Sequence, residues 1–279
     1  MGLENFEQGR TLLLADNHEN TLATRLVLED ARQRGGFDHV IILGDLVDGM
    51  KAVLARSGRT SNPNDVILLM REFEAEIVGK GGEFGVVAGN HDKQVLVVEM
   101  DLNRKLLNGD VWRIENGKIK KTLAPENLEW LAQKMMAPDG NFVEDLETRL
   151  FYATHQMPRH AREAGLMEAI HLDRILEVEQ EWVVAGHRHP HELYEHGEKK
   201  FVRIPSVGGL RSVDGWPGYA IYDARMNQLT VVWVTERWQS DAICRVIYGT
   251  QRQSRNAGGM VCAAQGAERN AGHAGAMKY

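Results

Sequence analysis

Five short apolar runs of this sequence end in residues that could bind a metal ion. The segments that follow them are Asp16-Asn17-His18, Gly44-Asp45-Leu46-Val47-Asp48, Gly89-Asn90-His91-Asp92, His155 and Gly186-His187-Arg188-His189. Asp, Asn and His side chains offer oxygen and imidazole nitrogen ligands, and none of the five segments contains Cys. This ligand set suits Mn, Fe, Zn or Ni rather than a structural thiolate zinc site.

The apolar runs themselves have the composition of buried β-strands. They span residues 10–15, 40–43, 85–88, 150–154 and 182–185. Helix-spaced apolar residues occupy residues 20–31 and 63–80, with Asn62 as the expected N-cap and Gly81-Gly82 as the end of the second helix. This alternation predicts a mostly parallel sheet. Since ligands bind at the carboxyl ends of strands in such sheets, Asp45 is expected where the chemistry takes place.

The rest of the chain changes pattern twice. Residues 93–149 contain an expected helix from Pro125 onward, and we expect a helical insertion over the strand ends, serving either as a lid or as extra packing. Alternating segments at residues 192–194, 200–204, 218–223 and 229–234 predict an antiparallel second sheet. Residues 236–279 are rich in Gly, Ala and Arg without periodicity, so we expect a largely disordered tail after a domain of residues 1–235.

The composition is that of a soluble globular protein, with 43% hydrophobic and 26% charged residues in 279. No apolar run has the length of a membrane span and no signal sequence is present, so we expect a cytoplasmic protein. Both cysteines, Cys244 and Cys262, lie in the tail, which excludes a disulfide framework for the core. The net charge is −6, with six basic and three acidic residues from Glu236 onward, so the preceding body carries −9. This acidity argues against nucleic acid as a partner.

In this order, the five motifs resemble those of the calcineurin-like metallophosphoesterase superfamily. Residues 123–131 and 205–209 are similar to segments of its bacterial phosphatase and phosphodiesterase branch, and the resemblance covers residues 11–234. It implies an α/β fold, a four-layer α/β/β/α sandwich with two mixed β-sheets and a helical insertion near the active site.

The resemblance also implies two divalent metal ions, with manganese expected and iron, zinc or nickel as alternatives. The ligands of one ion would be Asp16, His18, Asp45 and His189, and those of the other would be Asp45, Asn90, His155 and His187. Asp45 would bridge the ions, because two cations about 4 Å apart repel each other unless they share an anion. A bridging water, ionised to hydroxide, would attack a phosphate ester in line.

Further roles are implied for residues beside the ligands. His91 would be the general acid, with Asp48 placed to orient it, and Asn90 would bind the phosphate. Independently of the resemblance, Arg188 is a candidate for holding a substrate phosphate, because a guanidinium matches phosphate oxygens bidentately. The implied activity is hydrolysis of a phosphate mono- or diester in a small nucleotide-like substrate.

Several points stay open at this stage. A nuclease or a protein phosphatase could use the same centre, and a non-catalytic metal-binding scaffold is a further alternative. The acidic body argues against a nuclease, the missing Arg after Asp48-Gly49 against a protein phosphatase, and the complete ligand set against a scaffold. Glu19 and Gln156 replace residues that are usually Gly in the family, which places larger side chains beside the ions. His191 is expected either near the ions or in a solvated turn, and the oligomeric state cannot be read from the sequence.

Overall fold

The computed structural model of the chain describes residues 6, 8–47, 63–97, 123–156, 178–189, 191–196, 198–208, 216–234 and 276–278. Asp48 and Asn62 lie outside these residues, as do residues 98–122 of the expected insertion and residues 236–275 of the expected tail.

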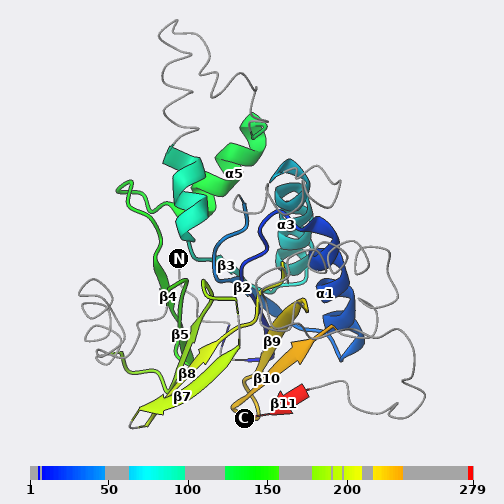
Figure 1. The fold of residues 1–279 in the computed structure, drawn as a ribbon, viewed down its shortest axis with the longest axis vertical. Helices are drawn as coiled ribbons and strands as arrows, with labels where there is room; N and C mark the ends of the chain where they lie inside the picture. The colour runs from blue at the N-terminus through cyan, green and yellow to red at the C-terminus, as the bar shows by residue number, and fades with distance from the viewer. Residues whose placement is uncertain are drawn as a thin grey trace, which may run out of the picture.

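The first sheet has six strands in the order β11-β10-β9-β1-β2-β3 (Figure 1). Their bounds are Arg10–Leu14 for β1, His39–Ile42 for β2, Phe84–Val86 for β3, Gly218–Asp223 for β9, Gln228–Trp233 for β10 and Ala276–Lys278 for β11. β1, β2 and β3 are parallel, as predicted, so their carboxyl ends lie at the same edge of the sheet. β9 runs antiparallel to β1, and β11 extends the sheet beyond β10.

The second sheet has five strands in the order β4-β5-β6-β8-β7. Their bounds are Asp145–Glu147 for β4, Phe151–Thr154 for β5, Trp182–Ala185 for β6, Glu192–His196 for β7 and Lys199–Arg203 for β8. β5, β6 and β8 are parallel, while β4 and β7 form antiparallel edges. Both sheets are therefore mixed.

The expectation that the four C-terminal strands form one antiparallel sheet is wrong. The β7–β8 hairpin joins the second sheet, whereas the β9–β10 hairpin joins the first sheet beside β1. The physical reason is that β9 is apolar on both faces. Tyr219 and Ile221 pack toward the helices, and Ala220 and Tyr222 pack between the sheets, so this strand needs cover on each side.

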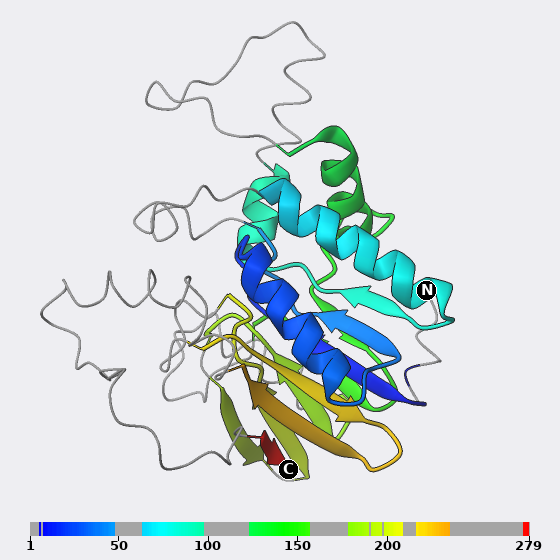
Figure 2. The ribbon, with the colours of Figure 1, turned by 90° about the vertical axis from the view of Figure 1, so that its right-hand side faces the viewer.

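The layers form an α/β sandwich, as predicted (Figures 1 and 2). The helices α1 (Thr21–Gln33), α3 (Pro63–Gly79) and α5 (Pro125–Met135) cover the outer face of the first sheet, where they pack on Leu12, Leu14 and Val40. Leu13 and Ile41 point to the other face and meet the second sheet. Because β1 and β2 are covered on both faces, the residues 12–14 and 40–42 within them are continuously apolar. Residues 157–177, which connect β5 to β6, lie outside the described residues.

Local signals explain where the first two helices begin and end. The side chain of Asn20 caps α1 by accepting a hydrogen bond from Ala23 N at 3.1 Å. α3 ends before Gly81, whose φ of +84° favours glycine, and Gly82 N donates to Ile77 O at 2.9 Å.

The described part of the insertion contributes to the core. Leu128, Leu131 and Met135 of α5 are buried together, as their spacing predicts. Trp130 Nε1 donates to Glu74 of α3 at 2.6 Å, which joins the two helices. α5 therefore packs as a structural helix on the first sheet. Within the described residues, no helix is both long and apolar enough to cross a membrane.

Candidate metal centre

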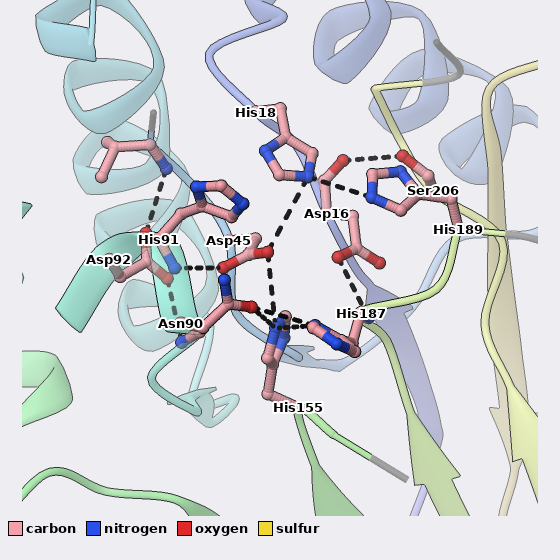
Figure 3. Close-up of polar contacts among 12 residues, drawn as sticks. Asp16, His18, Asp45, Asn90, His91, Asp92, His155, His187, His189 and Ser206 are labelled. Carbon is pink, nitrogen blue, oxygen red and sulfur yellow. Dashed lines mark hydrogen bonds and ion pairs between the residues drawn. The ribbon is translucent and has the colours of Figure 1, made fainter. Parts of the chain in front are cut away.

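The candidate ligands of the five motifs converge at the carboxyl ends of the parallel strands of both sheets (Figure 3). Asp16 and His18 follow β1, Asp45 follows β2, and Asn90 and His91 begin the helical residues 90–97 after β3. The second sheet contributes His155 after β5, and His187 and His189 after β6. The sequence prediction that these strand ends form one site is thus matched by their arrangement.

One group of possible ligands consists of Asp16, His18 and His189. The rings of His18 and His189 stack at an angle of 3°, with their Nε2 atoms 3.3 Å apart. Asp16 is fully buried, and its Oδ1 accepts a hydrogen bond from His187 N at 3.0 Å. Oδ2 of Asp16 is buried and has no hydrogen-bond donor. Because an unpaired buried carboxylate oxygen is unfavourable, a cation bound at this oxygen would stabilise it.

A second group consists of Asn90, His155 and His187. Oδ1 of Asn90 lies 3.0 Å from His155 Nε2 and 2.9 Å from His187 Nδ1, and these two nitrogens are 3.2 Å apart. Three atoms with lone pairs thus face one point, and a cation there would satisfy all of them.

Asp45 lies between the two groups. Its Oδ2 is 3.8 Å from His18 Nε2 and 3.4 Å from His155 Nε2, and its Oδ1 accepts a hydrogen bond from His91 N at 2.9 Å. Burial disfavours the charged form, but the hydrogen bond and charge of His155 hold the pKa of Asp45 below its usual range. An ionised carboxylate between two sets of nitrogen ligands is suited to bridge two cations.

The protein also fixes which nitrogen of His155 is available. Nδ1 of His155 lies 2.7 Å from the carbonyl oxygen of Leu43, so Nδ1 carries the proton and Nε2 presents its lone pair to the site. In the metal-free protein, burial raises the pKa of Asp16 to about 7. Burial lowers the pKa of His155, but the hydrogen bond and charge of Asp45 outweigh it and raise the pKa to about 9. In the absence of metal, protons on Asp16 and His155 thus offset the negative charge of the buried carboxylates. Divalent cations would offset this charge better, so the oxygen and nitrogen atoms of the site fit such ions.

The backbone at the site is strained in a consistent way. Seven residues other than Gly have positive φ in the described parts of the chain, and all but Asn227 belong to the site: Asp16, His18, Glu19, Asp45, His187 and His189. Left-handed φ is unfavourable for such residues and persists where the surroundings enforce it. The sharp turns aim successive side chains, such as Asp16 and His18, at the same point.

Asp92 has a role that was not predicted from the sequence. Its buried carboxylate accepts hydrogen bonds from Val47 N at 3.0 Å and Gly89 N at 3.1 Å. Burial, together with the charge of Asp45, raises the pKa of Asp92 to about 7. Asp92 ties the loop that carries Asp45 to the loop that carries Asn90.

The other predicted site residues have varied positions. The rings of His91 and His18 pack edge-on, with their centroids 5.2 Å apart, and Nδ1 of His91 is buried. Arg188 is half-buried between the two histidines of its motif.

The two departures from the family pattern and His191 differ in their surroundings. Glu19 is buried, whereas Gln156 is exposed. Nδ1 of His191 lies 2.9 Å from Arg203 O of β8, and its ring packs on Trp233 of β10, so this histidine contacts one strand of each sheet rather than lying in a solvated turn.

Comparison with known proteins agrees with this geometry. The model of the family described as calcineurin-like phosphoesterase matches residues 9–203, a range that contains every ligand discussed above. No curated protein sequence matches the chain.

Solved structures share the fold at low sequence identity. A metallophosphoesterase from Sphaerobacter thermophilus is 19% identical, with a TM-score of 0.54 over 87% of this chain and 94% of that one. The hypothetical protein PH1004 from Pyrococcus horikoshii OT3 is 14% identical, with a TM-score of 0.54 over 87% and 92% of the two chains.

Proposed function

Because the chain belongs to the calcineurin-like phosphoesterase family, and is thereby a hydrolase that acts on phosphoester bonds, we propose that its centre binds two divalent cations and hydrolyses a small nucleotide-like phosphate mono- or diester. The observation that carries the proposal is the position of Asp45, whose Oδ2 faces His18 at 3.8 Å and His155 at 3.4 Å.

The ligand assignment follows the two groups of side chains. Asp16, His18 and His189 would hold one ion, and Asn90, His155 and His187 the other, with Asp45 shared. When bound, the ions would lower the pKa of a water molecule and offset negative charge on the phosphoryl oxygens. Manganese is our first choice for this mixed oxygen and imidazole set.

The remaining residues would handle the substrate. His91 is fixed by its backbone hydrogen bond to Asp45, and its side chain would donate a proton to the leaving-group oxygen. Arg188, which lies between His187 and His189 in the sequence, would bind phosphoryl oxygens through its guanidinium, together with the amide of Asn90. Asp48 would orient His91, and this role stays a prediction from the sequence.

The test is hydrolysis of an aryl phosphate monoester and of the matching bis-aryl diester by chelator-treated protein, with Mn, Ni, Zn or Mg added back. We expect turnover that depends on the added metal, and the ratio of the two rates gives the preferred ester class. Nucleoside monophosphates and dinucleotides, tested next, address the nucleotide-like substrate.

The variant that tests the bridging role is Asp45→Asn, which removes the negative charge of the carboxylate while keeping the shape of the side chain. We expect it to lose metal and activity together. Full occupancy of two ions in Asp45→Asn would contradict the bridging role, and absence of turnover with every metal in protein that binds two ions would contradict the proposed reaction.

A further inference from the structure

Residues 205–208, which we call the strap, follow β8 of the second sheet and run beside the turn after β1 of the first sheet. All four residues of the strap are buried. Figure 3 shows Ser206 next to Asp16 and His189, two possible ligands that come from different sheets. The strap is therefore in contact with both halves of one metal-binding group.

The contacts are hydrogen bonds to the backbone of the ligand residues. Ser206 Oγ donates to Asp16 O at 2.8 Å, and Gly208 N donates to the same oxygen at 2.9 Å. Ser206 N donates to His189 O at 3.0 Å. A single residue, Ser206, thus binds the main chain of Asp16 through its hydroxyl and that of His189 through its amide.

Further contacts hold the strap itself in place. Val207 N donates to Ala15 O at 2.8 Å, and Asn20 Nδ2 donates to Gly208 O at 3.1 Å. Asn20 also caps α1, so the strap is tied to a helix as well as to both sheets. A Cβ at Gly208 would lie 2.9 Å from Asp16 O, which shows how closely the strap follows the turn.

The turn held in this way is strained. Asp16, His18 and Glu19 have φ values of 54°, 47° and 61°, which such residues adopt only where neighbouring groups enforce them. The Asp16 carbonyl accepts the hydrogen bonds from Ser206 Oγ and Gly208 N, so the strap holds the first residue of the strained turn in place. Loss of the Ser206 hydroxyl would let this turn relax and move Asp16 relative to His189.

We propose that Ser206 is a positioning residue that sets Asp16 against His189 and so determines the affinity of the ion held by Asp16, His18 and His189. The inference rests on the proposed dinuclear function. Groups that orient metal ligands without touching the metal typically change its affinity by about 10- to 100-fold. Among the described contacts, the ligands Asn90, His155 and His187 of the other ion make no main-chain hydrogen bond to the strap. They are linked to it only indirectly, through the hydrogen bond from His187 N to Asp16 Oδ1, so the affinity of that ion would change less.

The experiment is calorimetric titration of Mn into chelator-treated wild-type protein and into the variants Ser206→Ala and Ser206→Cys. Cys keeps the volume of the side chain and tests the hydrogen bond if Ala alters the fold. The matched control is Thr148→Ala, because Thr148 is also buried and donates through its hydroxyl to a backbone carbonyl, that of Phe151, at 2.9 Å. Thermal melting of the metal-free proteins compares their folding.

We expect both Ser206 variants to lower the affinity for one Mn ion by about tenfold or more and the affinity for the second ion by clearly less, and Thr148→Ala to bind both ions as the wild type does. In a His18→Ala background, where we expect that ion to be lost, Ser206→Ala should lower the affinity for the remaining ion by less than it lowers the affinity for the first ion in the wild-type background.

Equal weakening of both ions, or affinities unchanged from the wild type, would overturn the role of Ser206 alone. A wild-type protein that binds fewer than two ions would contradict the proposed function and this inference with it, so the two failures are distinguishable.

Discussion

The backbone of Gly89 lies so close to Asp45 that a Cβ on Gly89 would be 2.2 Å from both the amide nitrogen and Oδ1 of Asp45. The neighbouring atoms are the main chain and the carboxylate of Asp45, the residue that we propose to bridge the two ions. A side chain at Gly89 would therefore displace Asp45.

We expect Gly89→Ala to lower kcat/KM by about 100-fold or more, because a displacement of about 1 Å at a catalytic centre has an effect of that size. The measurement is metal-dependent hydrolysis together with Mn stoichiometry. The control is Gly79→Ala, since a Cβ at the end of α3 meets nothing within 4 Å. Equal activities of the two variants would show that the contact with Asp45 is tolerated.

His91→Gln is expected to retain both metal ions and to slow hydrolysis of esters with poor leaving groups by about 100- to 10,000-fold, the usual contribution of a general acid. The backbone hydrogen bond from residue 91 to Asp45 is kept in this variant. Rates with alkyl and aryl esters should be compared, because a good leaving group needs less protonation. A uniform loss for both ester types would argue against proton donation by His91.

Stability of the metal-free protein should fall as the pH rises from about 4 to about 9. The pKa values of Asp16 and Asp92 are raised from 3.8 to about 7, and that of His155 from 6.5 to about 9, so these three groups bind more protons in the folded than in the unfolded chain across this range. The stabilisation from protonated His155 is complete below pH 6.5 and is lost as the pH rises through 9. Urea midpoints measured in chelator at a series of pH values test this.

Saturating Mn should remove or reverse that fall, because cations replace the protons and bind more tightly as the ligands deprotonate. A urea midpoint that rises with pH in the presence of chelator would contradict the raised pKa values of Asp16, Asp92 and His155 as the cause of the pH dependence.

Asp92→Ala is expected to weaken Mn binding by about 10- to 100-fold, because Val47 N and Gly89 N lose their shared acceptor and the loops of Asp45 and Asn90 are no longer joined. Mn titration measures the effect. Asp139→Ala is a suitable control, since Asp139 accepts a backbone hydrogen bond from Asn141 in an exposed turn. A wild-type affinity in Asp92→Ala would limit this carboxylate to a purely local role.

The sequence was most informative where strands are buried on both faces. β1, β2, β5 and β6 coincide with continuous apolar runs to within one or two residues, because each must pack against two layers. β4 was not predicted, since the acidic segment Asp145–Glu147 is an edge strand that gains its place by pairing with β5. β11 was missed for a similar reason, as its pairing partner β10 is distant in sequence.

The types and order of the candidate ligands are visible in the sequence, and their role as ligands stays a prediction, but the way in which the fold positions them could not be predicted. The left-handed turns at Asp16 and Asp45 depend on hydrogen bonds from neighbouring strands and loops, which leave no local pattern in the sequence. Asp92 and Ser206 interact with main-chain groups, and a backbone amide or carbonyl has the same chemistry in every residue. Partners of this kind become visible only when the fold is known.

The order of the proposed ligands along the chain has a consequence for when the protein can take up metal during folding. The first of the proposed ligands is residue 16 and the last is residue 189, and each of the two groups of proposed ligands combines residues of both sheets. A chain that has folded only its first three parallel strands holds Asp45 without His155 or His187, so it lacks the contacts that make ion capture strong. Tight uptake of metal thus reports that contacts of long sequence separation, the slowest to form in folding, are complete.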